Sequence, residues 1–457
     1  MPEMPTRTSL FHHLRHSFRI FNSNGSFRLF GTLLLMNALP TLYQSVRIYF
    51  LGAFPADWGY NIASQLSWVS LFFEVIQEAF MLPLFYLLGQ ALHDRDELAN
   101  RVQTGLTLTI ITYCILAALL AFSAPHLTRF MAQKPELLAS TVTYIRLETI
   151  GIFFAAPLKF CSLVFLSLKN NRALLTILFL QMILSIALDT FLVSNTSISF
   201  KMGVNGIAWT NIMVNIFLLW VSFVFLRKDG LLSVATNLKW NFSWFKGWIK
   251  IGGYSGLESL VRNLAFVLMI VRLMNLISEQ GTYWLANNFI WGWLLLPVLA
   301  LGELIKRNSA ESPGDTLRLL PSYVIISLVV ILAWLTTSPF WHSFLQNVMG
   351  IENPDKVLYL VRLSLVFYMM FALNNIIDSI FYGLGRTDLM LVQSLLVNVL
   401  LYGAAFLLYC MGYFQPSLDN ITLLFGLGIT FDSVITVVLF YRLRPGLVAY
   451  QNIIHRP

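Results

Sequence analysis

Charged residues are scarce in this 457-residue chain, in which Asp, Glu, Lys and Arg make up 11% of the sequence and hydrophobic residues 57%. Roughly a quarter of the residues of an ordinary soluble domain are charged, so a soluble globular protein is excluded. Cysteine is scarce as well, because Cys114, Cys161 and Cys410 stand alone within apolar stretches at unrelated spacings. The sequence therefore predicts neither a disulfide framework nor a cysteine metal site.

Motifs for catalysis are also missing from the sequence. It contains no phosphate-binding Walker loop, no cluster of His and Cys with metal-ligand spacing, and no nucleophile elbow. We therefore expect neither an enzyme nor an ATP-driven pump encoded by this chain alone. We also expect no resident metal or cofactor.

Long apolar stretches are what the sequence has in abundance. A helix needs about 20 mostly apolar residues to cross the hydrocarbon core of a bilayer, and twelve stretches meet this requirement. They predict an all-α integral membrane protein. No cleavable signal peptide is evident, because the first stretch is long enough to span. The predicted spans lie near 29–53, 61–89, 103–123, 142–168, 172–194, 204–226, 247–275, 283–305, 317–341, 357–384, 389–412 and 420–443.

Basic residues are distributed unevenly among the predicted loops. With the N-terminus inside, twenty Lys and Arg residues fall in inner segments, and only Arg129, Lys134, Lys201 and Lys356 fall in outer ones. Cytoplasmic loops are rich in Lys and Arg, so both termini are predicted to be cytoplasmic. The net charge of +8 then indicates contact with anionic lipid head groups and does not imply nucleic-acid binding. We expect a multi-pass plasma-membrane protein, such as one of a bacterial inner membrane.

The two halves of the chain are related by an internal repeat. The segment 42–47, which ends on Arg47, returns 215 positions later as 257–262, which ends on Arg262, and 144–147 matches 360–363 at an offset of 216. A duplicated six-helix unit of this kind suits a two-lobed transporter. The repeat predicts an N-terminal segment (1–28), an N-lobe (29–226), a cytoplasmic linker (227–246), a C-lobe (247–443) and a cytoplasmic C-terminal tail (444–457).

Three short motifs point to a known family. They are Leu-Gly-Gln-Ala-Leu at 88–92, Gly-Val-Asn-Gly-Ile-Ala at 203–208 and Gly-Leu-Gly-Arg-Thr at 383–387. In this order within twelve spans, they resemble multidrug and toxic compound extrusion (MATE) transporters of the multidrug/oligosaccharidyl-lipid/polysaccharide flippase superfamily. The resemblance covers about residues 28–445. It implies two six-helix lobes facing a central cavity, and drug efflux driven by protons or sodium ions.

The same resemblance implies an ion site that this chain has altered. In many relatives, an acid on the first helix acts with an Asn and an Asp on the fifth and a Thr on the sixth. Asp189 matches the fifth-helix acid, Thr210 matches the threonine and Ser185 occupies the asparagine place, but Arg47 stands where the first-helix acid is expected. A guanidinium is a permanent cation. If Arg47 reaches Asp189, it takes the electrostatic place of the coupling ion and weakens or abolishes proton coupling there.

Other polar residues within spans are expected to line a cavity or to pair, because a charge at the bilayer centre costs about 2.5–3.5 kcal/mol. A cavity that holds Arg47, Lys159 and Arg262 predicts a small organic substrate that is anionic or zwitterionic. Structural ion pairs between helices are the simpler interpretation. The further candidates are Glu74 and Glu78 on one helical face, Glu258 one turn before Arg262, and Asp378 with Asn374 and Asn375.

These observations favour a MATE-like secondary transporter, expected to be a monomer, that exports a small organic solute by alternating access. Substrate and any coupling proton or Na⁺ would bind between or within the lobes. One alternative is a flippase of the same superfamily for a lipid-linked oligosaccharide or another amphiphile. Another is a membrane scaffold or receptor that transports nothing.

Overall fold

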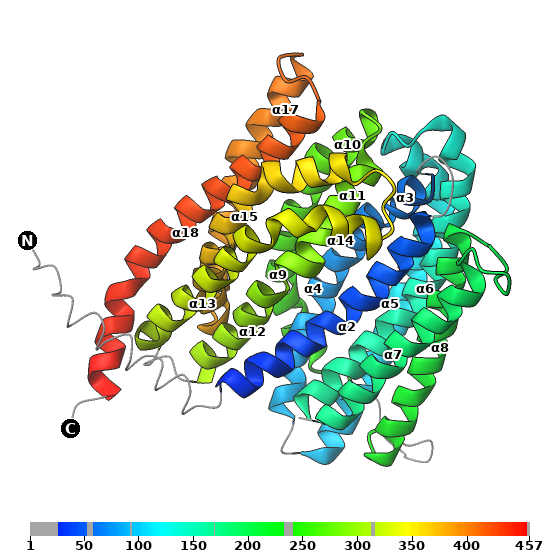
Figure 1. Cartoon of the computed structure of the whole chain (residues 1–457). Coiled ribbons are helices and arrows are strands. Elements are labelled where there is room, and N and C mark those ends of the chain that lie inside the picture. The colour runs from blue at the N-terminus through cyan, green and yellow to red at the C-terminus, as the bar shows by residue number, and fades with distance from the viewer. Residues whose placement is uncertain are drawn as a thin grey trace, which may run out of the picture. The chain divides into compact units, whose positions relative to one another are not determined.

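The computed structural model describes residues 26–52, 58–91, 94–168, 170–232, 241–311 and 316–454. These residues form helices joined by short turns and contain no strand, which confirms the predicted all-α fold (Figure 1). Most of the predicted N-terminal segment and the middle of the predicted linker lie outside the described residues.

Each predicted span corresponds to a helix or to consecutive helices of the structure. Their bounds in chain order are α2 (Ser26–Gly52), α3 (Trp58–Ala63) with α4 (Leu66–Gln90), α5 (Arg95–Phe130), α6 (Leu138–Ser167), α7 (Asn171–Leu192), α8 (Val204–Lys228), α9 (Phe245–Phe266) with α10 (Arg272–Leu276), α11 (Gln280–Phe289) with α12 (Leu296–Glu311), α13 (Thr316–Thr337) with α14 (Trp341–Asn347), α15 (Pro354–Gly383), α16 (Thr387–Leu396) with α17 (Gly403–Cys410), and α18 (Leu418–Ile454).

Eight of the described helices are long and apolar enough to cross a membrane. A ninth span results if the two pieces of the helix 280–310, which is bent by 55° at its break, are counted as one. The three other predicted spans correspond to α2, α4 and the α9–α10 helix, which are not among those eight. The sequence thus located the helices, although their ends shift: α18 continues to Ile454, past the predicted end of the last span at 443.

Local sequence explains where several helices begin. The Asp94 side chain accepts hydrogen bonds from the backbone N–H groups of Asp96 and Glu97 and so caps α5. The Asn170 side chain caps α7 in the same way, by accepting from the N–H of Ala173. These bonds satisfy N–H groups that the first turn of a helix leaves without a partner.

The described helices belong to two compact units, whose borders differ from those of the repeat. Both repeat arginines, Arg47 and Arg262, lie in unit 2. Arg262 belongs to this unit because its helix, α9, packs along α4. The units are defined by contacts between residues, whereas the predicted lobes are defined by the sequence repeat. The lobe boundaries therefore remain a prediction. Unit 1 comprises 1–41, 286–345 and 354–457, and unit 2 comprises 42–285 and 346–353.

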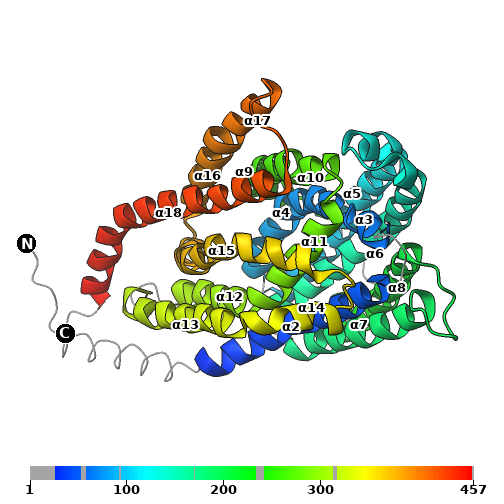
Figure 2. The same cartoon turned by 45° about the horizontal axis from the view of Figure 1, so that its top comes forward.

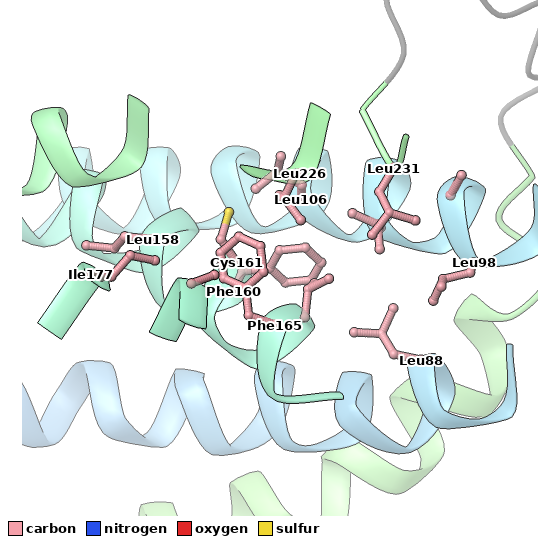
Figure 3. Close-up of a cluster of buried hydrophobic side chains, with 14 of the residues drawn as sticks. Leu88, Leu98, Leu106, Leu158, Phe160, Cys161, Phe165, Ile177, Leu226 and Leu231 are labelled. Atoms are coloured by element: carbon pink, nitrogen blue, oxygen red, sulfur yellow. The ribbon is translucent and has the colours of Figure 1, made fainter. Parts of the chain in front are cut away.

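Unit 2 is built around α6, which packs against α5 and α8, while α7 packs against α8 and α4 against α9. Figure 3 shows part of its core, in which Phe160, Cys161 and Phe165 of α6 meet Leu106 of α5 and Leu226 of α8. These side chains are almost fully buried. Burial of this apolar surface within the unit fixes how its polar side chains meet.

Two glycines allow close helix contacts in unit 2. A Cβ atom at Gly256 of α9 would lie 2.6 Å from the Cβ atom of Ala79 on α4. A Cβ atom at Gly206 of α8 would lie 2.8 Å from the carbonyl oxygen of Leu192. Both approaches are closer than a larger side chain permits, so each glycine allows its helix to pack closely on a neighbour.

In unit 1, α15 packs against α12, α13 and α18 (Figure 1). Tyr323, Ile376, Ile380, Phe381 and Phe440 belong to their shared core. Between α16 and α17, residues 397–402 form a π-helical turn, so that the two helices follow one another as one span (Figure 2). Such turns are found frequently at functional sites.

Candidate ion and substrate sites

The first candidate site is an ion pair inside unit 2. Nε of Arg47 on α2 lies 2.9 Å from Oδ2 of Asp189 on α7, and the two side chains are 8% and 1% exposed. The guanidinium therefore reaches the carboxylate that the sequence comparison placed in the ion site. The guanidinium carries a permanent positive charge beside this carboxylate.

Hydrogen bonds connect this ion pair to an amide side chain on α8 and to a carboxylate on α6. Nη2 of Arg47 donates to Oδ1 of Asn211 on α8 at 3.1 Å. The amide nitrogen of Asn211 donates to both carboxylate oxygens of Glu148 on α6, at 2.9 and 3.0 Å. Glu148 is 2% exposed. One arginine thus links two buried acids, one directly and one through an amide.

A small cavity of about 240 Å³ adjoins this network inside unit 2. Besides Arg47 itself, its wall includes Gln44, Ser67, Ser70 and Tyr144. These polar side chains stand in the same wall as the guanidinium, together with apolar residues such as Leu51 and Ile207. The cavity is smaller than the roughly 300–1,000 Å³ typical of drug-sized ligands, so it suits water or a small polar group.

The second candidate site is a group of charged side chains on α4 and α9, again in unit 2. We call it the Arg262 cluster; it comprises Arg262, Glu74, Glu78 and Glu258. Nη2 of Arg262 lies 3.0 Å from Glu78 and 3.5 Å from Glu74, and its Nε lies 3.4 Å from Glu258. Arg262 and Glu74 are 42% and 38% exposed. Unlike the Arg47 pair, this cluster is accessible from outside the protein core.

Lys159 extends the Arg262 cluster towards α6. Its Nζ donates to Oε1 of Gln77, which stands between Glu74 and Glu78 on α4. The cluster and Lys159 bring three acids together with two bases. The described contacts place Arg47 in one network and Arg262 in another, so a single cavity shared by both arginines remains a prediction.

The third candidate site lies in unit 1 and centres on Asp378 of α15. Asn374, one turn earlier, donates through Nδ2 to Asp378 at 2.9 Å and to Asp432 of α18 at 3.1 Å. Gln393 of α16 donates through Nε2 to Asp432 at 2.7 Å and to Asp378 at 3.4 Å. The hydroxyl of Thr436 donates to Asp378 at 3.3 Å. Three helices thus supply five polar side chains.

The remaining predicted site residues lie on α7, α8 and α15. Ser185 is buried on α7, one turn before Asp189. Thr210 is buried on α8, and its hydroxyl has no hydrogen-bond partner in the described part of the chain. It does not bond to its own helix backbone, as buried threonines often do. Asn375 donates to the carbonyl oxygen of Val298 and so supports packing of α15 on α12.

Sequence reasoning missed several members of these networks. Glu148 and Asp432 are acids within predicted spans, a signal that was present and not used. Asn211 directly follows Thr210 in the sequence. Gln393 and Thr436 gave no signal that separates them from ordinary polar residues of a span.

Comparisons with known proteins agree with this fold. Residues 33–191 match the MatE family model. An inward-facing multidrug resistance MATE-family transporter of the MOP superfamily superimposes with a TM-score of 0.70 at 16% identity, over 90% of this chain and 94% of the other. MATE multidrug transporter DinF-BH in complex with rhodamine 6G gives 0.68 at 15% identity, over 91% and 96%.

A third solved structure, a mutant of the Vibrio cholerae MATE transporter VcmN, gives a TM-score of 0.64 at 16% identity, over 97% of this chain and 99% of the other. A search of curated protein sequences finds no match. At this level of identity, the structural likeness concerns the fold. The chain therefore has the fold of MATE transporters of the MOP superfamily, and its residues 33–191 match the MatE family.

Proposed function

We propose that this protein is a MATE-like secondary transporter that exports a small organic solute by alternating access. The exposure of the Arg262 cluster is the observation that carries the proposal. Arg262 and Glu74 lie within predicted spans, yet each exposes more than a third of its side chain. Charged groups within spans ordinarily face the interior of a bundle or a water-filled pathway. The cluster therefore offers a polar contact to a solute that enters from water.

The charge of the cluster supports a solute with a positive group. Three carboxylates surround Arg262, whose guanidinium is already divided among them, and Lys159 adds one further base. With all five groups ionised, one negative charge remains in excess. A cationic or zwitterionic solute is attracted by this excess of negative charge. A purely anionic solute has less support, because Arg262 is already engaged.

The Arg47 pair supports altered ion coupling. Asp189 is held by a guanidinium at 2.9 Å, so a coupling cation would have to compete with a tethered charge. We propose that this site no longer takes up a proton or Na⁺ during transport. The pair instead holds α2 against α7. The proposed setting is a multi-pass plasma membrane, such as a bacterial inner membrane, with both termini in the cytoplasm.

Transport in liposomes tests the proposal. Purified protein should move a cationic dye, with rhodamine 6G as the first choice, against an imposed pH or Na⁺ gradient in the antiport direction. We expect Glu78→Gln to raise the KM for the dye about tenfold, because a charge-assisted contact is worth about 1.5 kcal/mol or more. Glu97→Gln is the matched control, since Glu97 also pairs with an arginine but lies in the first turn of α5, outside the cluster.

Other outcomes separate the alternatives. Translocation of a labelled lipid-linked oligosaccharide, without movement of the dye, would identify a flippase. If neither substrate moved under any gradient, the scaffold interpretation would replace the transporter. Equal dye kinetics in Glu78→Gln, Glu97→Gln and the native protein would remove the cluster from the substrate path.

A further inference from the structure

Buried amide side chains of unit 2 come from both predicted lobes. Two belong to the predicted N-lobe (29–226) and two to the predicted C-lobe (247–443), and each is 7% exposed or less. All four lie at or beyond the predicted outer ends of their spans. We call them the amide contact, which comprises Asn61, Gln65, Asn275 and Gln280.

Gln65 and Asn275 form the centre of the amide contact. Nε2 of Gln65, in the turn before α4, donates to Oδ1 of Asn275 on α10 at 2.7 Å. Nδ2 of Asn275 donates back to Oε1 of Gln65 at 3.1 Å. The indole N–H of Trp68 donates to the same oxygen at 3.1 Å. A reciprocal pair of amides thus joins the two predicted lobes.

Two neighbouring contacts also cross between the predicted lobes. Gly281 of α11 lies against α3, so that a Cβ atom there would be 3.3 Å from Oδ1 of Asn61. Nε of Arg272 on α10 donates to the carbonyl oxygen of Phe130, at the end of α5, at 2.9 Å. The predicted C-lobe therefore meets three N-lobe segments at the predicted outer face.

The chemistry of the amide contact suits an interface that opens. Water replaces neutral hydrogen bonds at little net cost in free energy, whereas separating an apolar core exposes apolar surface to water. Oε1 of Gln280 has no hydrogen-bond partner in the described part of the chain, although the residue is only 1% exposed. Native structures leave few buried acceptors unsatisfied. Entry of water between the amides would satisfy this oxygen.

The helix that carries Asn275 has a break that would let its outer end move. Residues 267–271 form a π-helical turn between α9 and α10, and such turns bend helices and are frequent at functional sites. On the inner side of this turn, Nε1 of Trp248 on α9 donates to the carbonyl oxygen of Phe80 on α4 at 2.9 Å. The inner part of the helix is thus held on α4 while α10 lies beyond the hinge.

We propose that the amide contact is an outer gate, which is closed in this structure. The gate opens when α10 and the start of α11 move away from α3 and α4 about the π-helical turn 267–271. The amides then exchange their mutual hydrogen bonds for bonds to water. This inference rests on the proposed transport by alternating access, and it names the side chains that part at the outer face.

A reversible crosslink across the gate tests the proposal. In protein whose three cysteines are replaced by alanine, Gln65→Cys with Asn275→Cys is treated with a short, reducible bifunctional thiol reagent. We expect dye transport in liposomes to fall at least about tenfold, because the tether prevents opening, and to recover on reduction. Two residues that never part could be crosslinked without this loss.

The matched control is a pair of neighbours within the predicted N-lobe. Nε2 of Gln133 donates to the hydroxyl of Thr141 at 2.9 Å, and both residues are buried. Crosslinking Gln133→Cys with Thr141→Cys should leave dye transport unchanged. Equal dye transport before and after complete crosslinking of Gln65→Cys with Asn275→Cys overturns the gate and leaves the proposed function intact.

Thiol labelling detects opening without any transport. In the purified full-length protein without its native cysteines, we expect a water-soluble maleimide to label Gln280→Cys at least about tenfold faster than Val142→Cys, because gate opening exposes residue 280 more often than local unfolding exposes a core residue. Val142 is buried in the apolar core of unit 2. Equally slow labelling of both cysteines overturns the gate. Fast labelling of Gln280→Cys in a protein that moves no dye supports the gate and contradicts the proposed function.

Discussion

Burial decides what an ion pair contributes at the residue scale. The Arg47–Asp189 and Arg101–Glu97 pairs have similar lengths, 2.9 and 2.7 Å, but only the first is almost fully buried. Removing one partner of a buried pair leaves an uncompensated charge and costs about 3–5 kcal/mol, whereas a surface pair contributes about 1 kcal/mol or less. Two ion pairs of similar length are therefore expected to contribute differently to the stability of the protein.

We predict that Arg47→Ala strongly destabilises the protein and that Arg101→Ala does so little. The Tm of the purified protein in detergent measures the difference. The double variant Arg47→Ala with Asp189→Ala should recover part of the loss, because it removes the stranded carboxylate. A loss of Tm in Arg101→Ala as large as in Arg47→Ala would contradict this interpretation of burial.

At Thr210 we predict a substitution that raises Tm. Its hydroxyl is buried without a partner in the described chain, so Thr210→Val replaces an unsatisfied polar group with a methyl of similar size. We expect Tm to rise, corresponding to about 1 kcal/mol. Thr149→Val is the control, since the Thr149 hydroxyl donates to the carbonyl oxygen of Ile145 at 2.7 Å and its removal should not stabilise. A lower Tm in Thr210→Val would indicate a partner that the structure does not contain.

At the scale of elements, the contact of α4 with α9 depends on one glycine. A methyl group at Gly256 would collide with Ala79 at 2.6 Å, whereas a methyl group at Gly253 on the same helix meets nothing within 4 Å. We predict that Gly256→Ala lowers Tm and disturbs the Arg262 cluster. Gly253→Ala should be neutral or stabilising by up to about 1 kcal/mol, because alanine favours the helix.

A compensating change sharpens this test. Ala79→Gly removes the atom that a Cβ atom at residue 256 would meet, so Gly256→Ala combined with Ala79→Gly should regain much of the lost Tm. If Gly256→Ala were as stable as Gly253→Ala, the helices would not approach as closely as the structure indicates.

The helices could be predicted from the sequence by their apolar runs. Only part of the candidate sites could be predicted, because their contacts depend on how the helices pack. Apolar runs of bilayer length located a helix or consecutive helices at each predicted stretch, because that length is set by the membrane. The family resemblance raised a contact of Arg47 with Asp189 as a hypothesis, and the structure places the two side chains 2.9 Å apart. The partnership of Asp378 with Asp432 was not, because two residues 54 positions apart carry no shared periodicity. Nothing in the sequence indicates that Arg262 pairs with α4, since helix packing within a unit decides that contact.

At the scale of the whole molecule, replacing Arg47 tests how ion coupling has changed. Arg47→Asp removes the tethered cation and places a second acid beside Asp189, as in the relatives to which the sequence is similar. We predict that dye transport by this variant gains a dependence on pH or Na⁺ at that site. Arg47→Lys, which keeps the charge, is the control. Identical pH and Na⁺ profiles for Arg47→Asp and the native protein would show that this position does not govern coupling.

The orientation of the molecule follows from its loops. The bias of basic residues predicts that Arg227, at the end of α8, is cytoplasmic and that Lys356, near the start of α15, faces outward. Both side chains are exposed, so cysteines placed there should react readily. After replacement of Cys114, Cys161 and Cys410 by alanine, a membrane-impermeant maleimide should label Lys356→Cys in intact cells. It should label Arg227→Cys only after permeabilisation. The opposite labelling pattern would invert the topology, and with it the direction in which the proposed transporter exports.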